Sequence, residues 1–265
     1  MIRWFDPEDK SRLVISPGDF LRDRGFDESM TIPENVVILH TRSAIPYITG
    51  KYAVSEYPFV VPGFLSNPHI YGLAGQAKVG LVQGGYGAPA AACLLESVIE
   101  LGCKRLFLLG LAGAVGEDVE LGELVIPSEI VREEGTSFHY MPDAGNVRPD
   151  EDLLKRLRGF LSGSGDLVLH EGKTVTTDAA FRQTLRKELR WREEGILAVE
   201  MEMSALLVVA RYHSVPAVAL LVISDKHDLD GDTPWTWDEE GMRAARMNAI
   251  DLMIEFAVTV AGAGR

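Results

Sequence analysis

Short runs of apolar and β-branched residues recur along the chain and alternate with segments of helical periodicity. Apolar positions at helical spacing predict helices over 88–101, 150–161, 202–213 and 238–262, with a further helix containing Phe181, Leu185 and Leu189. Strands that alternate with helices favour a largely parallel or mixed β-sheet covered on both faces. The runs typical of buried strands are NVVILH (35–40), KVGLVQ (78–83), RLFLLG (105–110), ELVIPSEIV (123–131), DLVLHE (166–171) and PAVALLVIS (216–224).

Local signals agree with these boundaries. Pro89 falls in the first turn of one predicted helix and Gly102 follows its end, while Asp238 is a candidate N-cap for the last helix. The segment 41–77 has no comparable periodicity, and we interpret it as a loop-rich excursion rather than a linker. We therefore expect a single domain over residues 1–265.

Composition narrows the function classes. The formal net charge is −13, and such an acidic chain lacks the basic footprint that nucleic acids or anionic membranes require. Without a long uninterrupted apolar run or an apolar segment after the first residues, we expect a cytoplasmic protein with no membrane association. Cys93 and Cys103, the 2 cysteines, are expected to be reduced and buried.

Metal binding is not expected. Asp228, Asp230 and Asp232 are spaced like the start of a calcium loop, with Glu239 at the twelfth position. That stretch lacks glycine at the sixth position and has proline at the seventh, so it departs from the calcium-binding pattern. The histidines show no metal-ligand spacing either.

Glycine-rich turns follow two of the predicted strands. Gly84, Gly85 and Gly87 separate one strand from a helix, and Gly110 and Gly113 follow another strand directly. Such glycines allow the backbone to approach a ligand closely, although tight turns without a ligand explain them equally well. The spacing does not match a dinucleotide-binding fingerprint.

Acidic residues in an apolar stretch are the most unusual chemical feature. Glu200 and Glu202 stand at the start of ILAVEMEMSALLVVARYHSVPAVALLVISD (196–225), where we expect a helix to begin. Residues two apart on a helix point about 200° from each other, so one glutamate is structural and one functional, or the preceding turn is irregular. For Glu200 the structural alternative is a carboxylate at a helix N-terminus. Glu202 is the better ligand candidate, because a carboxylate can accept both hydroxyls of a vicinal diol.

Several segments in the same order resemble one family. VEMEMSALLVVARYHSVPAVALLVISD, LGLAGAVGEDVELGELVIPSEIVREEGTSFHYMP, QGGYGAPAA and TTDAAFRQT are similar to segments of the type I nucleoside phosphorylases, a group that includes uridine and purine nucleoside phosphorylases and nucleosidases. The resemblance covers roughly residues 78–260. It implies a three-layer α/β/α sandwich that cleaves the N-glycosidic bond of a nucleoside, without a cofactor and with inorganic phosphate as co-substrate.

The resemblance also implies roles for individual residues. Glu202 and Met201, with Glu200 beside them, would hold the ribose. Asp225 would be the general acid that protonates the leaving base, and we expect its apolar surroundings to raise its pKa; its structural alternative is a turn or helix-cap aspartate. The residues implied to line the base site are Phe181, Arg182, Gly113, Ala112 and Ser224.

The phosphate site departs from the family pattern. Phosphorolytic members carry an arginine and a serine or threonine at the positions of Leu108 and Leu111. Two other phosphate-binding groups are open, Gly18 with Arg22, or Thr41 with Arg42, and we prefer Arg42 because it follows a strand. His69 is a candidate contribution to a neighbouring subunit's site, since family members are commonly dimers or hexamers and we expect a homo-oligomer.

Three functions therefore remain to be distinguished. The first is a nucleoside phosphorylase, a pentosyltransferase that produces ribose 1-phosphate. The second is a nucleosidase that uses water, which the two leucines favour, and the third is a non-catalytic nucleoside-binding protein. The base preference stays open, because Asp225 points to purines whereas EEGTSFHY and TTDAAFRQT are closer to the uridine branch.

Overall fold

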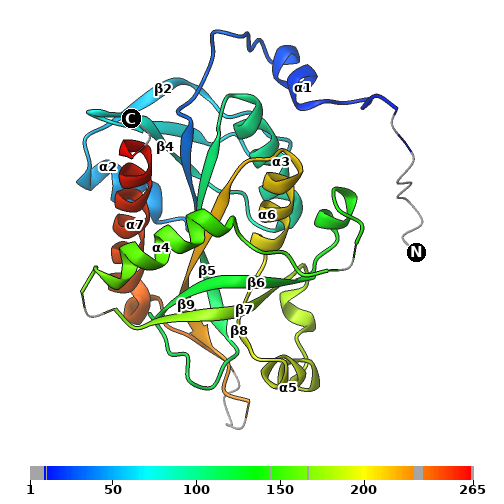
Figure 1. The fold of residues 1–265 in the computed structure, drawn as a ribbon, viewed down its shortest axis with the longest axis vertical. Helices are drawn as coiled ribbons and strands as arrows, with labels where there is room; N and C mark the ends of the chain where they lie inside the picture. Colours follow the sequence, from blue (N-terminus) through cyan, green and yellow to red (C-terminus); the bar gives the residue numbers. More distant parts are fainter. Residues whose placement is uncertain (1–8, 10, 144, 166, 230–234, 264–265) are drawn as a thin grey trace.

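The computed structural model describes residues 9, 11–143, 145–165, 167–229 and 235–263, and it shows a mixed α/β fold built on one sheet (Figure 1). The strands are β1 (Asn35–His40), β2 (Val54–Val60), β3 (His69–Leu73), β4 (Gln76–Gln83), β5 (Arg105–Ala114), β6 (Leu124–Glu133), β7 (Leu169–Thr177), β8 (Ile196–Glu200), β9 (Ala217–Lys226) and β10 (Thr236–Trp237). The helices are α1 (Pro17–Asp23), α2 (Ala44–Lys51), α3 (Ala88–Glu100), α4 (Glu151–Ser162), α5 (Leu185–Glu193), α6 (Met203–Tyr212) and α7 (Glu239–Gly262), with short 3₁₀ turns η1 (Thr136–His139) and η2 (Ala180–Arg182).

The sheet is partly closed on itself. Its strand order is β10-β9-β6-β7-β8-β5-β1-β4-β3-β2, and β9 also pairs with β5. The strands β5, β9, β6, β7 and β8 thus form a ring, while β1, β4, β3 and β2 extend from β5 as an open sheet. Since β1 is parallel to both β4 and β5, and β5 is parallel to β9, the carboxyl ends of these four strands lie at one edge.

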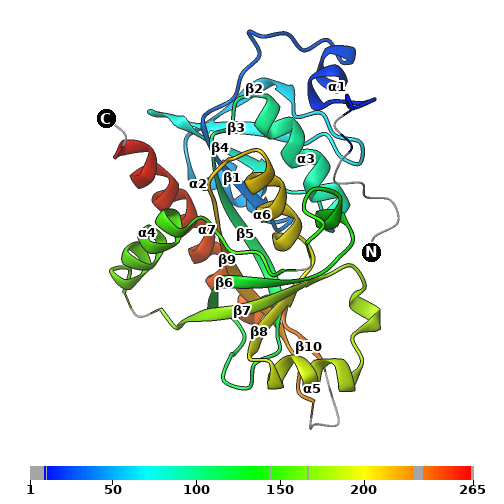
Figure 2. The same cartoon turned by 45° about the vertical axis from the view of Figure 1, so that its right-hand side comes forward.

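Helices cover both faces of the sheet, which confirms the predicted three layers. In Figure 2, α3 and α6 lie on one side of the central strands, and α2, α4 and α7 lie on the other. Each face has its own apolar core: Ile38, Leu108 and Leu206 belong to the core under α3 and α6, and Phe107 and Phe256 to the core under α7. Burial of β1 and β9 on both faces explains why their sequences are almost continuously apolar.

Most predicted elements are confirmed, including the cap of α7, where the Asp238 carboxylate accepts the Gly241 N–H at 2.9 Å. Two interpretations were wrong. The helix expected to contain Phe181 begins only at Leu185, because Phe181 belongs to the separate 3₁₀ turn η2. The helix expected over 202–213 is α6, and residues 196–200 before it form strand β8. The segment 41–77 is not a loop-rich excursion, since it contains α2, β2 and β3. The two strands lie at the edge of the sheet and are only partly buried, so their sequences lack the continuous apolar run of a buried strand.

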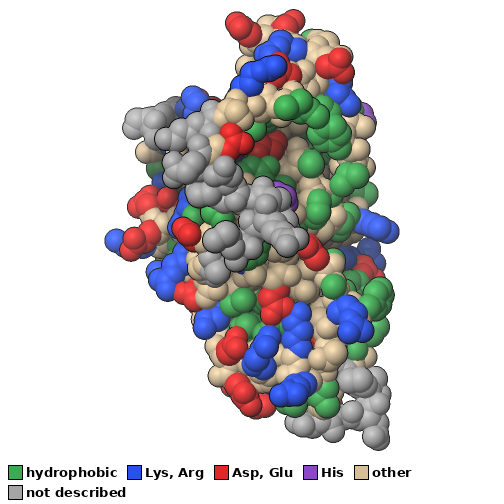
Figure 3. All heavy atoms as spheres, turned by 90° about the vertical axis from the view of Figure 1, so that its right-hand side faces the viewer, with side chains coloured by type: hydrophobic (Ala, Val, Ile, Leu, Met, Phe, Trp, Pro, Cys, Tyr) green, Lys and Arg blue, Asp and Glu red, His purple; other side chains and the backbone are tan. Residues whose placement is uncertain are grey.

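The surface charges, the helices and the metal-ligand residue types can be compared with the expectation of no nucleic-acid, membrane or metal partner. On the described part of the face in Figure 3, basic and acidic side chains are interspersed over the lower half, and hydrophobic side chains gather above. No helix within the described ranges is long and apolar enough to cross a membrane. No group of three or more His, Cys, Asp or Glu residues among the described ones could hold a metal ion, while Asp230 and Asp232 lie outside the described residues.

We predict that Phe107→Ala lowers the free energy of unfolding by about 3–5 kcal/mol, because the ring is fully buried and packs edge-on against Phe256 at 5.6 Å between centroids. Phe181→Ala is the matched control, since the Phe181 side chain is 103% exposed and should change the free energy by less than about 0.5 kcal/mol. Urea unfolding with an unchanged m-value measures both. Equal effects of the two substitutions would contradict the core described here.

Candidate functional site

Glu202 lies where two helices begin at the carboxyl edge of the sheet. One of its carboxylate oxygens, Oε1, accepts the backbone N–H of Gly87 at 2.6 Å. Gly87 is the N-cap of α3 and has a φ of 80°, a left-handed conformation that favours glycine. Glu202 is only 7% exposed, and no group among the described residues hydrogen bonds to Oε2. The second oxygen is thus available to a ligand.

Glu200 has a structural position at the same helix start. It ends β8, and its Oε2 accepts the backbone N–H groups of Glu202 at 2.6 Å and of Met203 at 2.7 Å. These donors belong to the first turn of α6 and have no partner within the helix. The turn between the two glutamates is irregular rather than helical, so Glu200 caps α6 while Glu202 reaches Gly87. Met201 occupies that turn and is half-buried.

The two carboxyl groups affect each other. Burial, followed by repulsion from Glu202, raises the pKa of Glu200 to about 8. The Thr176 hydroxyl donates to Glu200 and also accepts the Ser204 N–H at 2.9 Å, which ties β7 to the same helix start. The three hydrogen bonds that Glu200 accepts, from Thr176, Glu202 and Met203, offset burial and repulsion only in part.

Gly113 forms the floor on the other side of the site. In the sheet it pairs with Val199 of β8 on one side and with Asp225 of β9 on the other. Since neighbouring strands are about 4.8 Å apart, the backbones of Val199 and Asp225 are about 10 Å apart across Gly113. A Cβ atom at Gly113 would lie 2.7 Å from Nε2 of His227 and 2.9 Å from Oδ2 of Asp225. A glycine is required here because both side chains extend over its Cα.

Asp225 is embedded in hydrogen-bond donors. Its Oδ1 accepts the Ser224 hydroxyl at 2.6 Å, and its Oδ2 accepts the Trp235 indole N–H at 2.8 Å and lies 3.2 Å from Nε2 of His227. Ser224 also reaches the carbonyl of Ala112 at 3.3 Å. Burial disfavours the carboxylate, but the three donors outweigh it and lower the pKa of Asp225 below its usual value. The expected rise of this pKa was wrong, because the strand end is lined by donors.

His227 and Glu188 complete this group and were not singled out from the sequence. Nδ1 of His227 lies 2.6 Å from Oε2 of Glu188, and both side chains are more than 90% buried. Burial disfavours the imidazolium, but hydrogen bonds to Asp225 and Glu188 raise the pKa of His227 to about 9. The SDKH sequence was a usable signal for His227, whereas Glu188 lies in a charged helix and only its burial reveals it.

The predicted base-site residues are only partly brought together. Gly113, Ala112 and Ser224 lie with Asp225 at the ends of β5 and β9. Phe181 and Arg182 do not join them, because η2 presents both side chains to solvent, with Phe181 fully exposed.

Arg42 is a cation near the glutamate side of the site. It directly follows β1, and its guanidinium lies 5.5 Å from the ring centre of Tyr86, the residue before Gly87. Tyr86 is within electrostatic reach of both Arg42 and Glu202. Thr41 is buried beside it, with its hydroxyl 3.4 Å from that of Ser43.

Gly18 and Arg22 lie too far away to bind a ligand at the same site. A Cβ atom at Gly18 would come within 2.6 Å of the Glu100 carboxylate, at the C-terminal end of α3. That helix has 13 residues, so its ends are about 18 Å apart, and Gly87 is at the opposite one. Arg22 pairs with Asp19 at the surface. Within one chain, the structure thus does not bring this pair to Glu202.

The other positions considered for phosphate binding or for a neighbouring subunit lie in the apolar cores or at the surface. Leu108 is fully buried in the core under α3 and α6, and Leu111 packs against the core on the opposite face. Neither can donate a hydrogen bond to an anion. His69, at the start of β3, is exposed and lies 2.6 Å from Glu56, so its contribution to a neighbouring subunit stays a prediction.

His40 is a buried polar group that the sequence analysis did not consider. Its Nδ1 lies 2.9 Å from the carbonyl of Gly85 and must carry the hydrogen, because a carbonyl only accepts. Burial lowers the pKa of His40 in spite of nearby Glu202, so the ring is neutral. Its Nε2 is therefore an acceptor, and it has no partner among the described residues.

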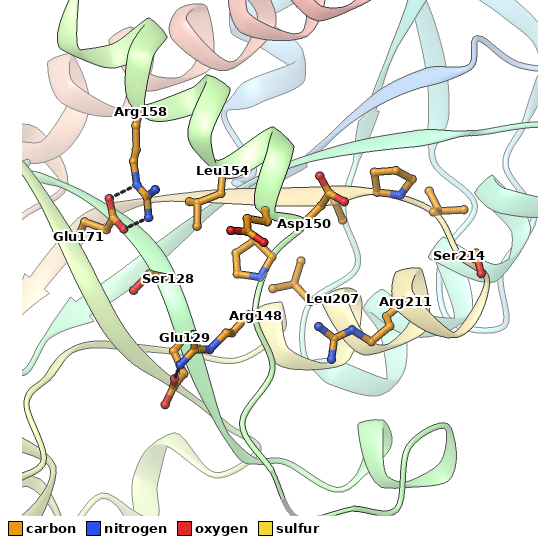
Figure 4. A pocket seen from close by; sticks show the side chains of 15 residues that line it. Ser128, Glu129, Arg148, Asp150, Leu154, Arg158, Glu171, Leu207, Arg211 and Ser214 are labelled. Carbon is orange, nitrogen blue, oxygen red and sulfur yellow. Dashed lines mark hydrogen bonds and ion pairs between the residues drawn. The ribbon is translucent and has the colours of Figure 1, made fainter.

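A separate cavity of about 720 Å³ opens at the amino end of β9 (Figure 4). It contains none of the predicted site residues, and Ala217 on its wall is at the other end of the strand from Asp225. Two of its arginines are neutralised, Arg148 by Glu129 and Arg158 by Glu171. We therefore place the functional site at the carboxyl edge and not in this cavity.

Two threonines of β7 allow a direct test of the α6 cap. Both Thr174 and Thr176 are fully buried, but the Thr174 hydroxyl has no partner among the described residues. We predict that Thr176→Val lowers the free energy of unfolding by about 1–3 kcal/mol, because it leaves Glu200 and the Ser204 N–H without their partner. Thr174→Val should be neutral or stabilising. Thermal unfolding of both variants measures this difference, and equal losses would exclude the capping role.

Comparisons with known proteins identify the family. The model of the phosphorylase superfamily matches residues 36–257. A DeoD-type purine nucleoside phosphorylase from Exiguobacterium sp. is 31% identical over 259 residues, which cover 95% of this chain and 93% of the relative. A guanosine phosphorylase from Halorubrum lacusprofundi is 30% identical over 139 residues, 52% of this chain and 57% of the relative.

The fold has solved counterparts as well. The crystal structure of uridine phosphorylase from Vibrio fischeri superposes with a TM-score of 0.72 at 20% identity, over 88% of this chain and 95% of that one. The family match extends over most of the chain, from β1 to the last helix, and includes every residue around Glu202 and Asp225. The chain belongs to the phosphorylase superfamily.

Proposed function

We propose that the chain is a nucleoside phosphorylase that cleaves the N-glycosidic bond of a purine nucleoside and transfers the pentosyl group to phosphate. The observation that carries the proposal is the presence of two unlike groups at the carboxyl edge of the sheet. One is Glu202 with a free carboxylate oxygen, beside Gly87, and the other is the hydrogen-bonded group of Asp225 and His227, over Gly113. The names of the most similar curated relatives, which are purine and guanosine phosphorylases, support the substrate class.

The chemistry of the bond requires both groups. As the C1′–N bond lengthens, positive charge builds on the sugar and negative charge builds on the base. A carboxylate that accepts the 2′- and 3′-hydroxyls stabilises the sugar, and its hydrogen bonds strengthen as the oxocarbenium ion forms. Protonation of the base stabilises the leaving group and typically contributes about 10²–10⁴-fold. No cofactor takes part in this scheme.

Phosphate would be held at the end of β1, where Arg42 and Thr41 follow the strand. Arg42 supplies a guanidinium within reach of Tyr86 and of the Gly87 turn, and guanidinium groups bind phosphate through paired hydrogen bonds. Such a local donor is needed because the protein as a whole carries a net charge of −13.

A nucleosidase is the second candidate, and a specific observation favours it. Leu108 is buried and apolar, and the neutral His40 presents an unpartnered acceptor rather than a donor near Glu202. An acceptor in that position suits a water molecule better than a phosphate dianion, which needs donors.

The quaternary structure and location form a further part of the proposal. We propose a homo-oligomer, supported by exposed apolar side chains at Leu13, Val14, Ile15, Phe64 and Leu65. A cytoplasmic location is supported by Cys93 and Cys103, which are both free thiols.

Product analysis decides between the candidates. The protein is incubated with inosine, adenosine or uridine, with and without phosphate, and free base, ribose and ribose 1-phosphate are quantified. We expect base release that requires phosphate and yields ribose 1-phosphate. Release of free ribose without phosphate would establish the nucleosidase instead, and binding without any release would establish a non-catalytic protein.

We predict that Glu202→Gln lowers kcat/KM for inosine by about 10²-fold or more, since hydrogen bonds to a charged group contribute about 1.5–3 kcal/mol each. Glu193→Gln is the control, because Glu193 is exposed on α5 and lies outside the site. Steady-state kinetics of both variants give the comparison. An unchanged kcat/KM in Glu202→Gln would remove the sugar-binding assignment.

A further inference from the structure

His227 is held between two carboxylates in the interior of the protein. Its Nδ1 lies 2.6 Å from Glu188 on α5, and its Nε2 lies 3.2 Å from Asp225 on β9. Ionised carboxylates only accept hydrogen bonds, so both ring nitrogens must carry hydrogen. Two carboxylates that face the two ring nitrogens favour the imidazolium, and the raised pKa of about 9 agrees with this geometry.

The surroundings of Asp225 favour its deprotonated form, whereas those of His227 favour the protonated one. It receives hydrogen bonds from Ser224, Trp235 and His227, which occupy both of its oxygens. At Asp225 these donors outweigh the effect of burial and lower its pKa, so they favour the carboxylate. Asp225 therefore does not hold the proton that a leaving base would take. The proton of this group resides on His227.

Nε2 of His227 is also the atom that faces the floor of the site. It would be 2.7 Å from a Cβ atom at Gly113, closer than any atom of Asp225. We propose that His227, and not Asp225, gives the proton to the leaving purine, and that Glu188 is a positioning residue which holds the imidazole through Nδ1. This proposal rests on the proposed function, because it requires that a nucleoside is cleaved.

The step balances as a single proton transfer. The C1′–N9 bond breaks and its electron pair moves into the purine ring. The ring nitrogen N7 then binds the proton from Nε2 of His227, which becomes neutral and keeps the Nδ1 hydrogen on Glu188. Asp225 remains a carboxylate, with Ser224 and Trp235 still donating to it. His227 regains its proton from solvent after the base departs.

The charges around His227 favour its protonated form. On α5, Arg192 donates to the His227 carbonyl at 2.6 Å and to the Val115 carbonyl at 2.7 Å, and it lies 3.7 Å from Glu117. The ring itself faces Glu188 and Asp225. The carboxylates of Glu188 and Asp225 contact the ring, whereas the guanidinium of Arg192 contacts only the His227 carbonyl, so the negative charges prevail at the imidazole. We therefore expect the inosine reaction to lose rate as the pH rises through about 9.

An N7-methylated purine nucleoside isolates this proton transfer, because its base is already cationic and leaves as a neutral molecule. We predict that His227→Gln lowers kcat for inosine by about 10²–10⁴-fold and leaves kcat for 7-methylinosine within a few-fold of the parent. His170→Gln is the matched control, since His170 pairs with Glu123 at 2.7 Å outside the site, and it should cleave both substrates normally.

Each result bears on the proposal. Normal inosine cleavage by His227→Gln, or an equal loss on both substrates, overturns it and leaves the proposed function intact. A parent protein that cleaves neither substrate overturns the proposed function and this inference together.

A second variant covers the case in which His227→Gln does not fold. Glu188→Gln keeps a hydrogen-bond acceptor for Nδ1 but removes the charge, so the high-pH limb of the inosine profile should move to lower pH while 7-methylinosine cleavage stays unaffected. An unmoved limb contradicts the role of Glu188 and His227.

Discussion

The start of α6 depends on the burial of two carboxyl groups within three residues. Isolated carboxylates are costly to bury, and this chain offsets the cost with backbone N–H groups. Glu200 takes the N–H groups of its own helix, and Glu202 takes the N–H of Gly87 at the start of α3. The N-termini of two helices are thereby fixed to each other at the carboxyl edge of the sheet, and the site is built around this junction.

Charge is divided between two groups at this edge, one at the end of β8 and one over Gly113, the floor at the ends of β5 and β9. On the β8 side, burial and repulsion raise the pKa of Glu200, and the carboxyl group of Glu202 lies beside Gly87. On the β9 side, a cationic imidazole stands between two carboxylates. A nucleoside bound across this floor would have its sugar near the negative group and its base near the proton. This matches the direction in which electrons move when the glycosidic bond breaks.

Whether phosphate or water is the nucleophile depends on the groups at the end of β1. Arg42 and the hydroxyl of Thr41 supply donors there, while His40 presents an acceptor and Leu108 neither. Because His40 and Leu108 lie on the adjacent parallel strands β1 and β5, their joint effect on an anion depends on the register of these strands. The base side of the site does not depend on it, since protonation of the leaving group serves water and phosphate equally.

The sequence by itself determined the alternation of strands and helices and the three-layer class, and it singled out Glu202, Gly113 and Asp225 as candidates. Those features follow from local periodicity and from acidic residues in apolar runs, which are written in consecutive positions. It did not determine that Ile196–Glu200 is a strand, nor that 41–77 completes the sheet edge, because short runs carry too few residues to show a period.

Only the tertiary structure brought Glu188 of α5 to His227 and, through the positions of α1 and α3, separated Gly18 from the site. It also reversed the expected pKa shift of Asp225. The donors that face a carboxylate come from segments distant in sequence, and their number decides whether burial or hydrogen bonding prevails.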